Sequence, residues 1–167
     1  MKIIVHDVLQ SNLMSPNQID ALKVKPFFEW FKECMDILRG KDIVLAVIAE
    51  GIDSQPEWVE YIRQHPEWNI QLHAWEHRTM TQLSNKQFVE HLSKAKQKIL
   101  DTFDVAPTRY FPPKLKWTKN THDMAESLGL REDHGRYRPV HWFSDHTINE
   151  IYIHFWNIND LKLIKQI

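Results

Sequence analysis

Short apolar runs alternate along this chain with longer segments in which apolar residues recur at helical spacing. Strands are predicted at residues 2–5, 43–49, 69–72, 109–111 and 148–155, where apolar and β-branched side chains cluster. The run at 43–49 is apolar throughout, which is typical of a strand covered on both faces. Strand–helix–strand order with right-handed crossovers predicts an α/β fold with a parallel sheet, open or closed into a barrel.

Helices are expected between these strands, and several of their ends carry recognisable signals. Pro26 opens a helix with an apolar stripe. Ser54–Glu57 and Ser84–Gln87 have the spacing of capping boxes, which mark the first turns of two further helices. The remaining expectations are helices at 120–128 and 161–164, a polar connection at 8–25 and an irregular segment at 130–147.

Composition places the chain among ordinary globular proteins. Its 167 residues predict one domain, residues 1–167. Its net charge of -1 lacks the positive excess that nucleic-acid binding needs, so no nucleic-acid partner is expected. No apolar run approaches the roughly 20 residues of a membrane span, so membrane insertion is not expected. The amino-terminal apolar stretch is too short for a secretory signal, so a cytoplasmic location is expected, with export by another route left open. The sequence does not define the oligomeric state.

Reactive residues follow several of the predicted strands. Asp7 comes just after the first strand, His73 just after the third, Pro112 and Pro113 after the fourth, and His154 lies near the end of the last. Ligand sites in parallel α/β folds form at the carboxyl ends of strands. We therefore expect these features to meet at one edge of the sheet.

The segment His73-Ala74-Trp75-Glu76-His77 suggests a metal site. On a helical turn, two histidines four residues apart can reach one ion, and the carboxylate of Asp7 would add a third ligand. Two imidazoles and a carboxylate suit a catalytic zinc, and non-haem iron accepts the same ligands. Because the chain has ten histidines, a chance pair in a surface turn is the alternative.

The last strand contributes a mixed face. Alternation places Tyr152, His154 and Trp156 on one side of the strand. His154 is then either a functional residue or a structural histidine in the core or at the rim whose ring nitrogens are hydrogen-bonded. Trp75, Trp117 and Trp156 lie next to the motifs, and their flat faces either stack on sugar rings or fill the core.

The ordered set of these motifs resembles a known family. Together, the segments His6-Asp7, His73–His77, Tyr110–Pro113 and Ile153–Trp156 are similar to the motifs of the NodB-homology polysaccharide deacetylases, carbohydrate esterase family four. The resemblance implies a distorted, abridged (β/α) barrel with parallel strands. It also implies a metal-dependent hydrolase that removes acetyl groups from N-acetylated sugars.

The resemblance further implies roles for particular residues. Asp7, His73 and His77 would hold a divalent metal, most often zinc, with cobalt, nickel or iron as alternatives. His154 would protonate the departing amine. The residues expected to contact an N-acetylated sugar or oligosaccharide are Trp75, Phe111, Pro113, Trp117 and Trp156.

Two positions depart from the family pattern. His6 stands where the family has an aspartate that acts as general base, and Phe111 stands where it has an arginine that holds that base. The base is therefore open between His6, Glu76 and activation of water by the metal alone. His6 precedes Asp7 on a strand, so regular alternation would point it away from the site. Asp145, or alternatively Asp133, is expected to orient His154.

Other functions remain open at this point. With the base and its arginine replaced, the chain could be a metal- or sugar-binding relic that releases no acetate. His73 to His77 also spells H-x-x-E-H, a metallopeptidase pattern, although in peptidases that motif lies inside a long helix. A plain α/β domain without metal is the third alternative.

Overall fold

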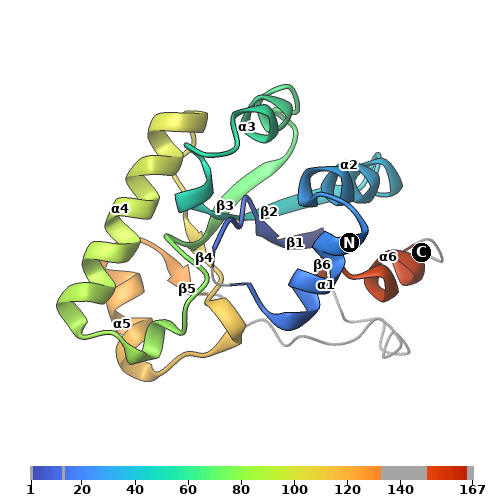
Figure 1. Cartoon of the computed structure of the whole chain (residues 1–167). Coiled ribbons are helices and arrows are strands. Elements are labelled where there is room, and N and C mark those ends of the chain that lie inside the picture. The colour runs from blue at the N-terminus through green and yellow to red at the C-terminus, as the bar shows by residue number, and fades with distance from the viewer. Residues whose placement is uncertain (1, 13, 133–149, 165–167) are drawn as a thin grey trace.

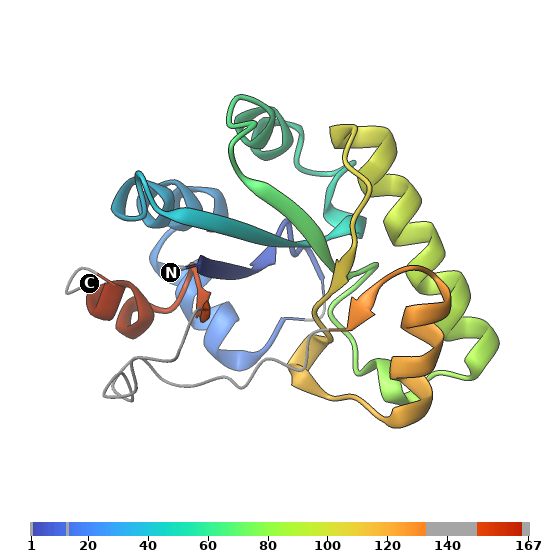
Figure 2. The ribbon, with the colours of Figure 1, turned by 180° about the vertical axis from the view of Figure 1, so that it is seen from behind.

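In a computed structural model of the chain, the strands form one parallel sheet with most of the helices packed along its outer side (Figures 1 and 2). The structure describes residues 2–12, 14–132 and 150–164. The strands are β1 (Lys2–Val8), β2 (Asp42–Ile48), β3 (Asn69–Ala74), β4 (Arg109–Tyr110), β5 (Arg131–Glu132) and β6 (Glu150–His154). The helices are α1 (Pro16–Val24), α2 (Phe27–Ile37), α3 (Pro56–Arg63), α4 (Asn85–Phe103), α5 (Lys119–Ser127) and α6 (Ile158–Ile164), with 3-10 turns η1 (Ala49–Gly51), η2 (Met80–Gln82) and η3 (Pro113–Leu115).

The strand order is β5-β4-β3-β2-β1-β6. Strands β2 to β5 follow one another on one side of β1, and the last strand, β6, pairs with its other side. Alternating side chains of β1 and β2 face two separate apolar clusters. Ile3 and Leu45 belong to the large core beneath the outer helices, whereas Ile4 and Val44 belong to a small cluster on the inner face. This two-sided burial confirms the prediction for the strand at 43–49.

The sheet curls strongly, and an ion pair on its inner face shows how far. Arg109 on β4 binds Glu150 on β6 through two hydrogen bonds, of 3.0 and 2.8 Å. In a flat sheet these strands would lie about 19 Å apart, because neighbouring strands are spaced by roughly 4.8 Å. Two side chains can bridge the strands only because the sheet bends into a half-barrel.

Several local expectations need correction. The segment at 8–25 is not a plain connection, because α1 forms within it, with Ser15 and Gln18 making a capping box. The predicted box at Ser54 is wrong: α3 begins at Pro56, and the Ser54 hydroxyl donates to the Gly51 carbonyl at 3.2 Å. The short strand β5 lies in the segment expected to be irregular.

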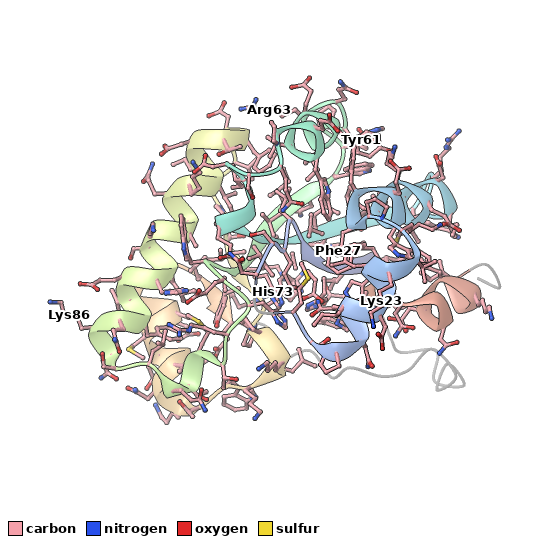
Figure 3. All side chains as sticks on the ribbon, viewed as in Figure 1. Lys23, Phe27, Tyr61, Arg63, His73 and Lys86 are labelled. Atoms are coloured by element: carbon pink, nitrogen blue, oxygen red, sulfur yellow. The ribbon has the colours of Figure 1, made fainter. Side chains whose placement is uncertain are left out.

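Other expectations are confirmed. The capping box of Ser84 and Gln87 starts α4, which buries an apolar stripe against the sheet. The helix after Pro26 and the helix near residues 120–128 form as expected. None of the helices within the described ranges is long and apolar enough to cross a membrane. Figure 3 shows that His73 lies near the centre of the molecule, whereas Arg63 and Lys86 project from outer helices.

Candidate metal centre

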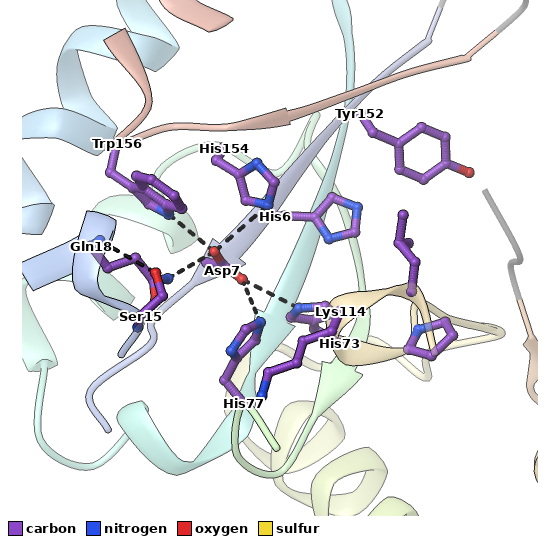
Figure 4. Close-up of a pocket in the computed structure, with 12 residues that line it drawn as sticks. His6, Asp7, Ser15, Gln18, His73, His77, Lys114, Tyr152, His154 and Trp156 are labelled. Carbon is purple, nitrogen blue, oxygen red and sulfur yellow. Dashed lines mark hydrogen bonds and ion pairs between the residues drawn. The ribbon is translucent and has the colours of Figure 1, made fainter. Parts of the chain in front are cut away.

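A pocket of about 390 Å³ lies at the carboxyl ends of the strands (Figure 4). Small-molecule sites range over roughly 300–1,000 Å³, so this pocket has the volume of a compact ligand site. The structure brings Asp7, His73 and His154 together here, as expected for residues at the ends of parallel strands. The lining residues are His6, Asp7, Ser15, Gln18, His73, His77, Pro112, Lys114, Leu115, Tyr152, His154 and Trp156.

Two β-bulges direct side chains into the pocket. Between Val5 and Val8, β1 has one residue more than the paired stretch of β2, and Asp7 adopts a left-handed φ of 61°. His73 is the extra residue of β3 opposite β2. Bulges re-aim side chains beside functional sites. His6 and Asp7 therefore both line the pocket, although a regular strand would point them to opposite sides.

Three potential ligands converge on the pocket floor. The ligand atoms of Asp7, His73 and His77 all lie within 4.8 Å of one another. Asp7 Oδ1 is 3.3 Å from the Nε2 atoms of both His73 and His77. The two histidines do not share a helical turn as predicted, because His73 lies on β3 and His77 in the loop before η2. The loop nevertheless folds back and brings both rings to the carboxylate.

The donor set fits a divalent metal ion. Asp7 Oδ1 and His73 Nε2 are both buried, and neither has a hydrogen-bond partner among the residues that the structure describes. His73 Nδ1 lies 2.6 Å from the Phe111 carbonyl, so Nδ1 carries the proton and Nε2 presents its lone pair. Buried polar atoms that are left without partners in this way call for a ligand.

Burial and charge set the protonation of these groups. Burial lowers the pKa of His77 to about 4, even though the negative charge of Asp7 opposes that shift. Burial acts to raise the pKa of Asp7, but the surrounding imidazoles hold it well below its usual range. Near neutral pH, His77 is therefore uncharged and Asp7 is ionised, as metal coordination requires.

His6 is buried in the wall of the pocket. Its ring contacts those of His73, Phe111, Tyr152 and His154, at centroid distances of 5.0, 5.6, 5.4 and 5.7 Å. Burial and the neighbouring histidines lower its pKa well below the ordinary value. His6 Nε2 has no hydrogen-bond partner within the described part of the chain. His6 is thus a buried, neutral imidazole in the wall of the pocket near neutral pH.

His154 is oriented by an aspartate that was not predicted from the sequence, Asp160. Asp160, on α6, accepts a hydrogen bond from the backbone N–H of His154 at 2.9 Å, and its carboxylate lies 3.5 Å from His154 Nδ1. Burial alone would lower the pKa of His154, but Asp160 and Asp7 raise it above the ordinary value. The expected partners Asp145 and Asp133 lie outside the described residues.

The structure does not bring Glu76 or Trp75 to this pocket. Glu76 pairs with Arg78 at 3.1 Å, and both Glu76 and Trp75 line a separate hollow. The ammonium group of Lys94 lies 3.5 Å from the centre of the Trp75 ring. These contacts assign Glu76 and Trp75 to the surface beside α4 rather than to the metal centre.

The other residues that were expected to contact a sugar differ in their burial and in whether they line the pocket. Trp156 lines the pocket and donates from Nε1 to Asp7 Oδ2 at 3.0 Å. Phe111 and Pro113 are buried beside it and do not line it, although Phe111 holds His73 through its carbonyl. Trp117 is 48% exposed and also lies outside the lining.

Gln18 and Lys114 also line the pocket and were not among the residues predicted from the sequence. Gln18 belongs to the α1 capping box, and the spacing of Ser15 and Gln18 is a signal that could have found it. Lys114 follows the double proline with a φ of 58°, a strained conformation that is common at functional sites. No pattern in the sequence marks that conformation in advance.

The sequence is similar to those of known proteins of one family. Residues 26–132 match the sequence profile of the polysaccharide deacetylases. Chitin deacetylase 1 of Cryptococcus neoformans var. grubii is 30% identical over 114 residues. The matched region covers 66% of this chain and 22% of the fungal protein, so this chain corresponds to only a part of that relative.

Solved structures share the fold. A family 4 carbohydrate esterase from Streptomyces lividans, in complex with acetate, matches with a TM-score of 0.68 at 20% identity, covering 82% of this chain and 78% of the other. A family 4 pseudoenzyme from Bacillus anthracis matches with a TM-score of 0.71 at 12% identity, covering 99% and 58%. These likenesses confirm the distorted, abridged (β/α) barrel.

Proposed function

Because this chain belongs to the polysaccharide deacetylase family, we propose that it hydrolyses the acetamido groups of N-acetylated sugars with the help of a divalent metal ion. Asp7, His73 and His77 would hold the metal. The observation that carries this proposal is the convergence of their three ligand atoms, within 4.8 Å, on the floor of the pocket. Two imidazoles and one carboxylate leave coordination positions open, as in catalytic zinc sites.

When bound, a divalent ion supplies Lewis-acid activation of the water and of the acetyl carbonyl. Hydrolysis then forms one C–O bond and breaks the amide C–N bond. One proton must leave the water, and one must reach the departing nitrogen. The chain therefore has to provide a proton acceptor and a proton donor beside the metal.

His154 is the proposed proton donor. Asp160 lies beside His154 Nδ1, so Nε2 is the ring atom that is directed toward Asp7 and the metal centre. The raised pKa of His154 favours the imidazolium form, which can protonate the amine as the C–N bond breaks.

His6 is the proposed proton acceptor. Of the two side chains considered for this role, His6 lines the pocket and Glu76 does not. The lowered pKa of His6 keeps its ring neutral near pH 7, so a ring lone pair can accept the water proton. His6→Ala is expected to lower kcat by about 10²- to 10⁴-fold, the usual contribution of a general base.

The ligand set favours zinc but also suits cobalt, nickel or iron. Metal content of the purified untagged protein, combined with acetate release from chitin and peptidoglycan oligosaccharides, tests the proposal. We expect one metal per chain and release of acetate. His73→Ala should abolish both, whereas His65→Ala, which removes a histidine outside the pocket, should abolish neither. Acetate release by metal-free protein, or by His73→Ala, would refute the metal-dependent reaction.

A non-catalytic relic is the second candidate function. It is favoured by His6 and Phe111, which stand where the family resemblance implies an aspartate and an arginine. One metal per chain without acetate release from any acetylated sugar would support it. The metallopeptidase alternative loses its basis, because the H-x-x-E-H segment spans the end of a strand and a loop rather than a helix.

A further inference from the structure

Helix α1 lies against the pocket through an unusual residue. Gln18 is 1% exposed and is the buried residue of this helix, whereas Ile19 and Val24 are 48% and 71% exposed. Helices normally pack through an apolar face. A helix that buries an amide and exposes its large apolar side chains needs another reason for its position.

The hydrogen bonds of Gln18 fix the orientation of its amide. Its Oε1 accepts from the backbone N–H of Ser15 at 2.7 Å, which is half of the capping box. Because Oε1 is held there, Nε2 must face the pocket. Nε2 donates to Asp7 Oδ2 at 2.9 Å and to Gln10 Oε1 at 2.5 Å.

These hydrogen bonds make the two carboxylate oxygens of Asp7 different from each other. Asp7 Oδ2 accepts from Gln18 Nε2 at 2.9 Å and from Trp156 Nε1 at 3.0 Å. Asp7 Oδ1 faces His73 and His77 and has no hydrogen bond to the described residues. Neutral N–H donors thus hold one oxygen and leave the other available to a metal (Figure 4).

We infer that Gln18 is a positioning residue for the metal centre: its amide sets the rotation of the Asp7 carboxylate so that Oδ1 points at the metal. This inference rests on the proposed metal-dependent function. It also accounts for glutamine rather than glutamate, the other residue that completes a capping box, at this position. A glutamate here would have no N–H to donate and would place a second carboxylate beside Asp7.

The chain contains a matched control. Gln87 occupies the same position in the capping box of α4, where its Oε1 accepts from the backbone N–H of Ser84 at 3.0 Å. Gln87 is exposed and lies outside the metal pocket. Gln18→Met and Gln87→Met therefore remove the same half of a capping box, but only Gln18→Met removes a donor to Asp7.

The test is binding of zinc by chelator competition and the visible absorption spectrum of the cobalt-loaded protein. Gln18→Met should weaken zinc binding by about 10- to 100-fold, the usual effect of losing such a partner, and should alter the cobalt spectrum. Gln87→Met should match the wild type in both. Gln18→Glu, which keeps the cap acceptor, should also alter the spectrum, and it replaces Gln18→Met if that variant fails to fold.

The outcomes separate this inference from the proposed function. If the wild type binds zinc but the Gln18 variants keep its affinity and spectrum, the positioning role is refuted and the metal site stands. If Gln87→Met weakens zinc binding as much as Gln18→Met, helix capping rather than the amide donor is responsible. If the wild type binds no metal, both proposals fall.

Discussion

The burial of His77 makes the stability of the metal-free protein depend on pH. Its pKa is about 4 in the folded protein, against 6.5 for an unperturbed histidine. Between these values the unfolded chain binds a proton at this position and the folded chain does not. Stability from the neutral imidazole is therefore fully present above about pH 6.5 and is lost as the pH falls toward 4.

The size of the effect follows from the difference between the two pKa values. Each pH unit in this window is worth about 1.4 kcal/mol, so the full range amounts to about 3 kcal/mol. Between about pH 7 and pH 4.5, the share of His77 is about 2 kcal/mol. His6 acts in the same direction, since its pKa is also lowered, while His154 acts in the opposite direction because its pKa is raised.

The comparison that isolates this share uses wild type and His77→Gln, both stripped of metal with a chelator. Urea unfolding at a series of pH values gives the free energy of unfolding of each protein. We expect the advantage of wild type over His77→Gln to shrink by about 2 kcal/mol as the pH falls from about 7 to 4.5. A difference between wild type and His77→Gln that is constant across this range would refute the burial argument.

Three further predictions concern contacts beside the pocket, across the sheet and in the loop after β1. Asp160→Asn should lower the pKa of His154 and move the alkaline limb of the kcat/KM profile to lower pH; an unshifted profile would contradict the assigned contact. Arg109→Met and Glu150→Leu should each destabilise the protein, and a double-mutant cycle by urea unfolding should give a coupling of about 1–3 kcal/mol; additive effects would show that the pair does not hold the curled sheet together. Gly51→Ala should cost at least about 2 kcal/mol in thermal unfolding, because the new Cβ would lie 1.7 Å from a backbone carbonyl that follows β1; a variant as stable as wild type would contradict that packing.

The sequence predicted five of the six described strands, β5 being the exception, and the meeting of Asp7, His73 and His154, because chain order and strand ends follow from hydrophobic patterning. It could not predict which way His6 points, since a bulge in β1 leaves no mark in the periodicity. Asp160 was missed because α6 returns it to His154 through tertiary packing. The single-domain assignment of residues 1–167 and the cytoplasmic location stay predictions.

Helix α1 was missed for a different reason. Its segment carries a capping box but has no apolar face, and periodicity is the stronger of the two signals. The side chain that fixes the helix is an amide bound to a carboxylate, so the contact appears only once the fold is assembled. Polar contacts of this kind are where prediction from hydrophobic patterning fails first.

The bulges in β1 and β3 imply a conflict between stability and chemistry in the central strands. Removing one residue between Val5 and Val8, or removing His73, would restore continuous pairing with β2. The shortened strands would form a more regular ladder, and the chain would lose a residue that lines the pocket each time. Selection for thermal stability alone would therefore tend to erase this pocket, whereas selection for turnover has to retain two irregular strands at the heart of the sheet.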